Sequence, residues 1–432
     1  MRFYPLLLAL ALPCFALTVK DVLIGAAKSD AVSSKIYTAK AYKKAYEGTT
    51  GKLYPRIDVS YRGIDYSEQP SMTVNLPPLL QNTKMVNAPK NYYEGEITVR
   101  YPLFRGFAID STVQKAKLEA KKGELEADDT KRNIYAKAVS LYFGIVSLKK
   151  SEEAYDSAAV SALESLKKAR AMFKEGLIGA YDVENIKSRY HEIQSGRIGI
   201  KNQKESLINT LYRISGLRFD GVLEGEGVYP VQKSEIISEA LEKREDVLAV
   251  KTVLEIGDEE IRGAKSGFYP NIDVVAGIKR AGDTPRLNGD GFTNQDKSYA
   301  AVSASMNIFD GFESTKAVEA ARAKRMAAEL FYLDYKNGVQ TEIENLFLEL
   351  ESAKQRVEAL NQNVKSATEF YRLTNARFDN RLVGADELSR SIADLAAANS
   401  RLAAEQNRVY ELGLRILLES SLKNFENKLR LP

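Results

Sequence analysis

Phe104-Arg105-Gly106-Phe107 returns later in the chain as Phe309-Asp310-Gly311-Phe312. A second pair of segments is separated by the same number of residues. These are Phe173-Lys174-Glu175-Gly176-Leu177-Ile178-Gly179-Ala180 and Phe378-Asp379-Asn380-Arg381-Leu382-Val383-Gly384-Ala385. The chain therefore carries two structurally equivalent halves. A repeated unit that combines strands with very long helices indicates an elongated assembly rather than an enzyme.

Equivalent strand entries precede these motifs, at Tyr54-Pro55-Arg56-Ile57-Asp58-Val59 and Tyr269-Pro270-Asn271-Ile272-Asp273-Val274. Each half is expected to hold a helix, two strands and a long helical hairpin. We divide the chain accordingly into a signal peptide, a first repeat, a linker, a second repeat and a C-terminal tail, at residues 1–16, 17–216, 217–233, 234–424 and 425–432.

The first residues are typical of a secretory signal peptide. Arg2 precedes an apolar run at 6–12, and small residues follow near Ala16, after which we expect cleavage. Cys14 leaves a lipid anchor open, but Pro13 before it fits a lipid-attachment site poorly. No later stretch reaches the roughly 18 consecutive apolar residues of a membrane helix. We therefore expect a periplasmic or secreted protein, or one held in an outer membrane by strands.

Charge is nearly balanced, with 62 Lys and Arg against 58 Asp and Glu and a net charge of +4. No basic block or aromatic-interleaved patch indicates nucleic acid as a partner. His191 is the only histidine, which excludes a multi-histidine metal site, and the sequence holds no complete nucleotide fingerprint. We expect no enzyme activity, no catalytic residue, no metal and no cofactor.

Four segments alternate apolar and polar residues with the period of a β-strand. Each is roughly ten residues long, the length of a tilted strand that crosses a bilayer. Tyrosines near the strand ends, such as Tyr54 and Tyr269, would suit a membrane interface, and the connecting loops 67–91 and 280–297 are long. From alternation alone, a soluble antiparallel sheet with one wet face is an equal alternative. The apolar positions are Ile57, Val59 and Tyr61; Tyr93, Ile97, Val99, Tyr101 and Leu103; Ile272, Val274, Ala276 and Ile278; and Val302, Ala304, Met306 and Ile308.

Two stretches, 103–229 and 286–431, contain no proline and have the pattern of long helices with one break each. From 314 to 378 the pattern runs for about 65 residues, or roughly 100 Å of helix. A helix of that length must pack lengthwise against partners. The breaks near Gly179 and Gly384 turn each stretch into an antiparallel hairpin, because glycine readily ends a helix.

A seam with alternating spacings of three and four follows both long helices, which specifies a coiled coil. Only Glu152 is out of place in it. The seam comprises Ala138, Leu141, Ile145, Leu148, Glu152, Tyr155, Ala159, Ala162, Leu166, Ala169 and Phe173 in the first half, and Ile343, Leu346, Leu350, Ala353, Val357, Leu360, Val364, Ala367, Tyr371, Thr374 and Phe378 in the second.

With these motifs the chain resembles the TolC family of outer-membrane efflux channels. The strand entries, the Phe-x-Gly-Phe turns and the two hairpin breaks have the order, duplication and spacing of that family. The resemblance implies a mixed fold of coiled-coil helices and transmembrane strands. In a homotrimer, each chain would add four strands to a twelve-stranded β-barrel, continued by a long α-helical barrel into the periplasm.

The resemblance implies a passive outer-membrane channel in a Gram-negative bacterium, in contact with outer-membrane lipid. Such a channel is the exit duct of a tripartite efflux or type I secretion system. It docks on a periplasmic adaptor protein and an inner-membrane transporter, and its periplasmic entrance is gated.

The family's functional residues correspond here to the two helix breaks, which we call the hairpin tips (residues 173–183 and 378–388), and to Arg390 just after the second. Arg381 stands where the second tip would carry a glycine, and Val383 where some members have an arginine. Arg390 replaces an aspartate of some members, so a closing link from Asp182 is expected to reach Arg381 or Arg390. By this match the adaptor-docking surface falls on Gly176, Leu177, Gly179, Arg381, Leu382 and Gly384, and the aperture on Asp182, Arg381, Asp386, Glu387 and Arg390.

Threefold symmetry would gather Asp386 and Glu387 near a narrow axis, and a ring of like charges attracts cations. We therefore expect cation preference and block by divalent ions. The equal alternative is that the two acids only stabilise a helix N-terminus, by roughly 0.3–1 kcal/mol. The alternative for the whole chain is an exported periplasmic coiled-coil structural or tethering protein, which would be recovered without detergent.

Overall fold

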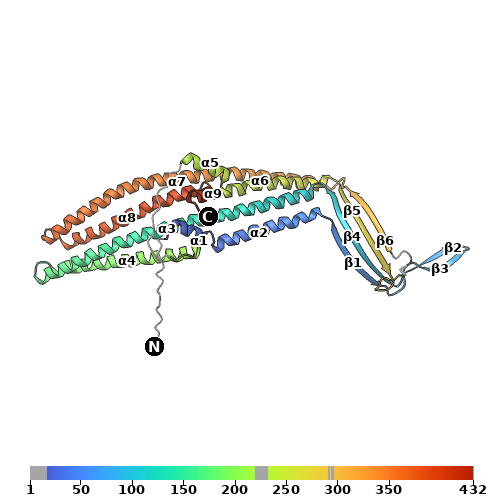
Figure 1. The fold of residues 1–432 in the computed structure, drawn as a ribbon, viewed down its shortest axis with the longest axis horizontal. Coiled ribbons are helices and arrows are strands. Elements are labelled where there is room, and N and C mark those ends of the chain that lie inside the picture. The colour runs from blue at the N-terminus through green and yellow to red at the C-terminus, as the bar shows by residue number, and fades with distance from the viewer. Residues whose placement is uncertain (1–16, 219–231, 290–291, 293–295, 432) are drawn as a thin grey trace, which may run out of the picture. The chain divides into compact units, whose positions relative to one another are not determined.

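The computed structural model describes residues 17–218, 232–289, 292 and 296–431. The expected signal peptide with Cys14, and residues 219–231 of the expected linker, lie outside the described residues. The described chain is mostly helical and carries two sheets. Its elements (Figure 1) are α1 (Val19–Ala26), α2 (Asp30–Thr50), η1 (Gly51–Leu53), β1 (Arg56–Asp65), β2 (Ser71–Leu76), β3 (Leu80–Val86), β4 (Asn91–Arg105), α3 (Ala108–Lys174), α4 (Ala180–Ser215), α5 (Lys233–Lys243), α6 (Glu245–Ala264), η2 (Lys265–Phe268), β5 (Asn271–Gly282), β6 (Asp296–Ser305), α7 (Glu313–Asp379), α8 (Ala385–Leu418) and α9 (Leu422–Leu429).

Two compact units divide the chain, and each draws on both halves of the sequence. Unit 1 comprises Met1–Ala39, Lys122–Val250 and Tyr332–Pro432, and unit 2 comprises Lys40–Lys121 and Lys251–Phe331. The strands belong to unit 2 and the hairpin tips to unit 1. The long helices α3 and α7 each contribute residues to both units.

The main sheet of unit 2 consists of four antiparallel strands in the order β1-β4-β5-β6 (Figure 1). All four predicted strands are therefore present, but the bounds of the fourth were wrong: β6 begins at Asp296 and ends at Ser305, so Met306 and Ile308 lie beyond it. The register places predicted apolar residues in rows, since Ile57 is opposite Val99 and Val99 is opposite Ala276. Because alternate side chains point to opposite sides of a strand, these rows share one face of the sheet.

The stretch 67–91, predicted as a long loop, contains a second sheet. Strands β2 and β3 pair antiparallel, with Met72 opposite Met85 and Val74 opposite Thr83. Short alternating runs lie on both sides of Pro77 and Pro78, and proline favours the turn between them. The sequence reading missed this hairpin because the flanking runs are short and largely polar.

Pro102 lies in β4, a central strand, where its missing N–H cannot join the hydrogen-bond ladder. The register between β4 and β5 shifts at this point, since Pro102 is opposite Asp273 and Phe104 is opposite Ile272. A β-bulge in β4 therefore accommodates the proline. After the bulge Phe104 stays on the apolar face, and Arg105 on the polar face forms an ion pair with Asp273 at 2.7 Å.

Both Phe-x-Gly-Phe motifs form the same strand-to-helix turn. Gly106 and Phe107 have φ values of +56° and +69°, and Gly311 and Phe312 have +66° and +71°. Two successive left-handed residues redirect the chain from the strand into the following helix. The two phenylalanines of each motif pack edge to face, with ring centroids 5.3 Å apart in the first half and 5.5 Å in the second.

Helices α3 and α4 form one hairpin of unit 1, and α7 and α8 form the other (Figure 1). Every position of the predicted seam is buried or half-buried except Phe173. Phe173 is 47 % exposed, whereas its counterpart Phe378 is 3 % exposed. The prediction for Phe173 was wrong because its neighbour Met172 packs against the core near the tips instead. Glu152 forms an ion pair with Lys204 of α4, which accounts for a charged residue in the seam.

The main core of unit 1 includes residues 425–431, which were predicted as part of a tail. Ser421 begins helix α9 by accepting a hydrogen bond from the Asn424 N–H at 3.2 Å. Phe425 and Leu429 of this helix are fully buried, and the Phe425 ring packs against that of Tyr135 at 5.9 Å between centroids. This end of the described chain is thus part of the core.

Candidate functional site

The first hairpin tip ends α3 with a left-handed residue. Gly176 has a φ of +72°. Its N–H donates to the Phe173 carbonyl at 3.0 Å, and the Leu177 N–H donates to the Met172 carbonyl at 2.9 Å. These two bonds satisfy carbonyls that the end of a helix would leave free. Gly179 then precedes α4 in an extended conformation.

The second hairpin tip has the same backbone with a different residue. Arg381 has a φ of +61°. Its N–H donates to the Phe378 carbonyl at 2.9 Å, and the Leu382 N–H donates to the Arg377 carbonyl at 2.8 Å. Gly384 precedes α8 as Gly179 precedes α4. The departure from glycine at position 381 therefore leaves the turn unchanged.

Both tips share one small hydrophobic core, which brings the predicted site residues to the same end of unit 1. Alanines make much of this core, so the helices can approach closely, and α4 packs against α8. Lys168 of α3 also pairs with Asp379 of α7 at 3.0 Å. The fully buried members include Ala162, Leu166, Ala169, Ile186, Phe378, Ala385 and Leu388.

The five predicted aperture residues lie in this region, but the structure does not join them to one another. Asp182 is half-buried and accepts a hydrogen bond from the Gly179 N–H at 3.2 Å. Arg381, Asp386 and Arg390 are exposed, and Glu387 is half-buried. Among the described residues no ion pair links Asp182 to Arg381 or Arg390. Asp182 therefore caps α4 within the chain, and the predicted link to Arg381 or Arg390 is not formed there.

The predicted docking residues form a mixed surface at the tips. Leu382 is 68 % exposed, while Leu177 is half-buried. Gly176, Gly179 and Gly384 are exposed. Leu382 is thus an exposed apolar side chain of the second tip.

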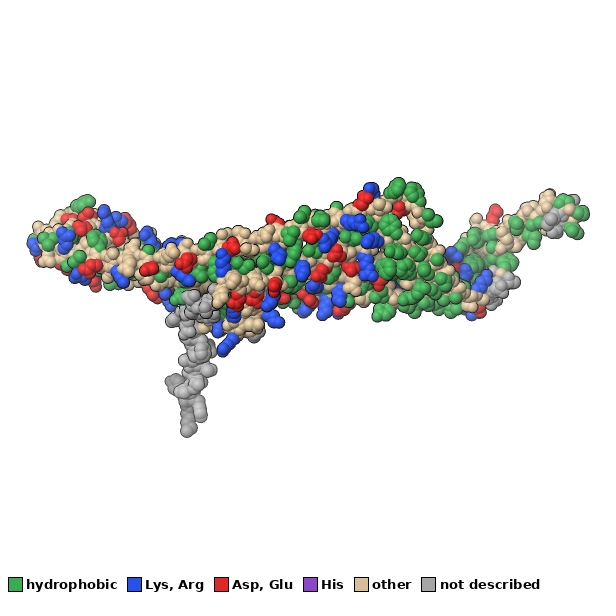
Figure 2. All heavy atoms as spheres, turned by 90° about the horizontal axis from the view of Figure 1, so that it is seen from above, with side chains coloured by type: hydrophobic (Ala, Val, Ile, Leu, Met, Phe, Trp, Pro, Cys, Tyr) green, Lys and Arg blue, Asp and Glu red, His purple; other side chains and the backbone are tan. Residues whose placement is uncertain are grey.

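One face of the main sheet is apolar and exposed. Figure 2 shows hydrophobic side chains gathered over this part of the molecule. Val59 of β1 and Val302 of β6 are 76 % and 71 % exposed, and Leu103 of β4 is 57 % exposed. Exposed apolar side chains of this density on adjacent strands indicate a surface that contacts lipid or protein.

The opposite face of the sheet is polar and cross-linked. Glu94 of β4 pairs with Arg62 of β1 at 3.1 Å and also with Lys279 of β5. The Tyr92 hydroxyl donates to Glu94 at 2.6 Å, and the Tyr299 hydroxyl of β6 donates to Glu96 at 2.7 Å. All four strands therefore contribute polar or charged side chains to this face, as expected for a surface in contact with water.

A buried ion cluster in unit 1 was missed by the sequence reading. Arg244, between α5 and α6, binds Asp246 through two nitrogens at 2.7 and 2.8 Å and also pairs with Glu419. Arg132 of α3 pairs with Glu419 at 3.2 Å and with Asp129 at 2.7 Å. The contiguous Arg244-Glu245-Asp246 between two helices was the available signal. The cluster ties α3, α6 and the end of α8 together, which suits a structural role.

Burial and ion pairing shift the pKa values of the acids in this cluster in different directions. The pKa of Glu419 is raised by burial, although Arg132 and Arg244 oppose the shift. Burial acts in the same sense on Asp246, but the hydrogen bonds and charge of Arg244, together with Arg132 and Tyr335, outweigh it, and the pKa of Asp246 is lowered. Burial raises the pKa of Glu245 to about 7. One of its oxygens accepts the Leu422 N–H at 2.9 Å, and the other has no hydrogen-bond partner among the described residues.

No helix in the described ranges has an apolar stretch of the length needed to cross a membrane. Within the same ranges, His, Cys, Asp and Glu nowhere cluster in a way that could hold a metal ion.

Comparison with solved structures identifies the fold. VceC, an outer membrane protein of Vibrio cholerae, superposes with a TM-score of 0.79 at 14 % identity, covering 93 % of this chain and 95 % of that chain. The CmeC outer membrane channel of Campylobacter jejuni gives 0.78 at 14 % identity, with 93 % and 84 % covered. The open state of the MtrE outer membrane channel of Neisseria gonorrhoeae gives 0.69 at 16 % identity, with 93 % and 88 % covered.

A search of curated proteins finds no match. The family model described as outer membrane efflux protein matches residues 35–217 and 236–417, which together make up most of the chain. The resemblance to TolC-like channels that the sequence motifs suggested is confirmed by this match, and the chain belongs to the outer membrane efflux protein family.

Proposed function

We propose that this protein is a passive outer-membrane channel, the exit duct of a tripartite efflux or type I secretion system. The observation that carries the proposal is the main sheet, with one exposed apolar face, one cross-linked polar face and two unpaired edges. An apolar face suits lipid, and a polar face suits a water-filled interior.

The edges of the sheet favour a homotrimer. Strands β1 and β6 are each ten residues long and, among the residues that the structure describes, pair on one side only. Long unpaired edges recruit further strands. Four strands cannot close a barrel, whereas three copies would supply twelve. Tyr54 and Tyr269, exposed at 67 % and 42 % at the start of β1 and β5, suit the membrane interface.

The hairpin tips would then form the gated periplasmic entrance. Leu382 and the neighbouring glycines offer a docking surface to a periplasmic adaptor, which connects the channel to an inner-membrane transporter. Arg381 and Arg390 are exposed and without an ion-pair partner among the described residues, so they are available to Asp182 of another copy. The same symmetry would gather Asp386 and Glu387 into a ring that attracts cations.

Single-channel recording tests the proposal. The detergent-extracted protein is reconstituted in a planar bilayer, where we expect discrete conductance steps that rise in Arg381→Gln and Arg390→Gln. Lys365→Gln, an exposed charge change in α7 away from the tip, should leave the steps unchanged. Asp386→Asn with Glu387→Gln should reduce cation preference and block by divalent ions, whereas Asp394→Asn on α8 should not.

A protein recovered without detergent that gives no conductance steps would contradict the channel and favour the periplasmic coiled-coil tether. Conductance steps of the same size in the wild type and in every tip variant would support the channel and show that these residues do not gate it.

A further inference from the structure

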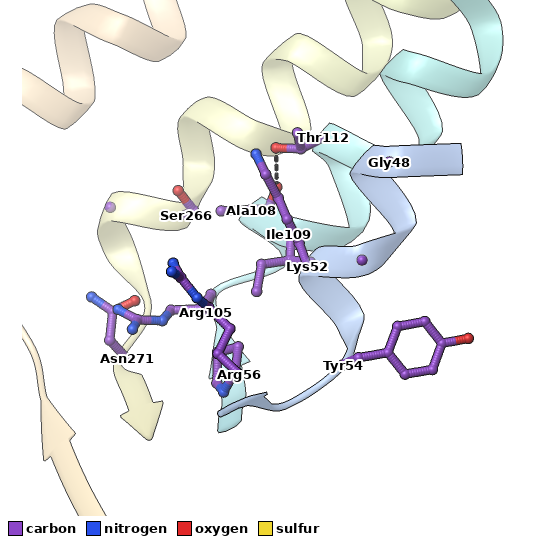
Figure 3. Close-up of a pocket in the computed structure, with 13 residues that line it drawn as sticks. Gly48, Lys52, Tyr54, Arg56, Arg105, Ala108, Ile109, Thr112, Ser266 and Asn271 are labelled. Atoms are coloured by element: carbon purple, nitrogen blue, oxygen red, sulfur yellow. Dashed lines mark hydrogen bonds between the residues drawn. The ribbon is translucent and has the colours of Figure 1, made fainter. Parts of the chain in front are cut away.

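One cavity of unit 2 is lined by basic side chains that the fold at this position does not require. It encloses about 630 Å³ where the end of α2, the end of β4, the first turns of α3 and the entry to β5 meet. Figure 3 shows the side chains around it, and we call it the junction cavity. It is lined by Gly48, Gly51, Lys52, Tyr54, Arg56, Pro102, Arg105, Ala108, Ile109, Thr112, Ser266, Gly267 and Asn271.

The lining is basic. Lys52 comes from η1, Arg56 from β1 and Arg105 from the end of β4, and no acidic side chain is among the described residues that line the cavity. Three carboxylates lie outside the lining: Asp273 pairs with Arg105 at 2.7 Å, Asp58 pairs with Arg56 at 3.8 Å, and Asp110 follows Ile109 in the first turn of α3. Cations converging on a concave surface create a positive potential that attracts an anion.

The start of α3 adds to this potential. Ala108 and Ile109, the first two residues of the helix, line the cavity. The first N–H groups of a helix have no partner within it, and the helix dipole is positive at this end. Arginine guanidinium groups supply paired donors that match the oxygens of phosphate. The donor set therefore suits a compact oxyanion with several acceptor oxygens.

The position of the cavity favours a water-soluble ligand over a lipid headgroup. Arg56 is opposite Arg100 in the register and shares its face with Arg62, which pairs with Glu94. Arg105 lies on this same polar face, through its pair with Asp273. The apolar face that suits lipid is on the other side of the sheet.

The internal repeat shows that the charges are not a by-product of the fold. The second half repeats the same strand entry and the same strand-to-helix turn. Its residues at the positions of the three basic side chains are neutral or acidic: Gly267 for Lys52, Asn271 for Arg56 and Asp310 for Arg105. One half alone carries the basic set, so the repeated strand entry and turn do not themselves require it.

We infer that the junction cavity binds the phosphate group of a water-soluble ligand, with Lys52, Arg56 and Arg105 as its cationic contacts. Under the proposed function this face lines the channel, so the site would hold phosphorylated solutes in transit. The binding itself does not depend on conduction.

Isothermal titration calorimetry of the detergent-purified full chain with inorganic phosphate, at constant ionic strength, tests the inference. We expect saturable binding that Lys52→Gln with Arg56→Gln weakens by roughly tenfold or more, since each variant removes a charge-assisted contact. Arg105→Gln is made together with Asp273→Asn, so that no carboxylate is left unpaired, and should weaken binding similarly. Lys324→Gln, an exposed charge change on α7 of the same unit, should leave binding unchanged.

Absence of phosphate binding by the wild type, or equal binding by the cavity variants, would overturn the inference. A second arm uses nanodiscs of phosphatidylglycerol or phosphatidylcholine and identifies retained lipid by native mass spectrometry. Selective retention of phosphatidylglycerol through the basic residues, with no response to free phosphate, would overturn the assignment to a soluble ligand. Neither arm measures conduction. A protein that does not bind phosphate can therefore still be a channel, and a protein that gives no conductance steps can still bind phosphate.

Discussion

Gly176 and Arg381 occupy the same backbone position in the two hairpin tips, with φ values of +72° and +61°. Each donates its N–H to the carbonyl three residues earlier, at 3.0 and 2.9 Å. Left-handed backbone is costly for every residue that carries a Cβ and free for glycine. The first tip therefore avoids a cost that the second tip bears.

Gly176→Ala should destabilise the protein by about 1 kcal/mol, because it imposes this cost on the first tip. A Cβ at Gly176 would meet no atom within 4 Å, so the effect is one of backbone conformation and not of a clash. Thermal unfolding in detergent, followed by circular dichroism, measures it.

The matched control is Gly199→Ala in the interior of α4, where a Cβ also meets nothing within 4 Å. Helical backbone favours alanine there, so this variant should stabilise by about 0.5–1 kcal/mol. Equal effects of the two substitutions would contradict the left-handed geometry of the first tip.

Asp182 accepts the Gly179 N–H at 3.2 Å, a contact within one chain. Asp182→Ala should therefore expose that amide and cost about 0.5–1 kcal/mol locally, whether or not the residue also gates the channel. Hydrogen exchange at the Gly179 amide reports on the cap, and conductance reports on the gate.

Faster exchange without a change of conductance would assign Asp182 to helix capping alone. Glu184→Ala, at an exposed position two residues further along α4, provides the control for lost charge and should leave the Gly179 amide protected. If Asp182→Ala leaves exchange unchanged, the hydrogen bond is not formed in solution.

Glu152 and Lys204 form the one ion pair that occupies a seam position of the first hairpin, and their side chains are 16 % and 17 % exposed. Lys204→Met should destabilise by roughly 1–3 kcal/mol, because it leaves a largely buried carboxylate unpaired. Adding Glu152→Leu should recover most of the loss, since leucine restores the apolar seam. Chemical unfolding of the two single variants and the double variant yields the coupling energy.

Lys44→Met breaks an ion pair with Glu47 whose side chains are 77 % and 47 % exposed, and provides the comparison. Surface pairs contribute little, so its effect should stay below about 0.5 kcal/mol. If Lys204→Met is as mild as Lys44→Met, Glu152 is solvated in the assembled protein.

Regular patterns made most of the fold predictable. The four strands follow from alternation, the long helices from the lack of proline, and the seam from its spacing, because each is a local consequence of which face is buried. Phe173 shows that spacing alone does not always predict burial. Its spacing is identical to that of Phe378, yet Phe173 is exposed and its neighbour Met172 packs against the small hydrophobic core near the tips.

The backbone of the hairpin tips was predictable from the sequence, whereas the roles of their residues in docking and gating stay predictions. The repeated tip sequences located Gly176 and Arg381, and the structure shows that both take the same turn. The partners of the charged residues were not predictable, since Arg132, Arg244, Asp246 and Glu419 come together from distant parts of the sequence. A pairing of this kind depends on helix packing, which no local pattern encodes.

Glu245 provides a prediction with a defined pH window. Burial raises its pKa from 4.5 to about 7, so the folded protein takes up a proton that the unfolded chain releases. The contribution of this group to stability is complete below pH 4.5 and is lost as the pH rises toward 7. The loss amounts to roughly 1–3 kcal/mol at most.

Glu245→Gln keeps an oxygen for the Leu422 N–H and removes the titration. Its stability relative to the wild type should therefore increase between pH 5 and pH 8, by up to ~3 kcal/mol. Urea unfolding at several pH values measures the difference, and Glu242→Gln, the same change at an exposed position, should show none. Asp246, whose pKa is lowered, loses its contribution only at more acidic pH and does not enter this window. A constant difference between Glu245→Gln and the wild type would show that Glu245 is hydrated and ionised in the folded protein, with its second oxygen bonded to water.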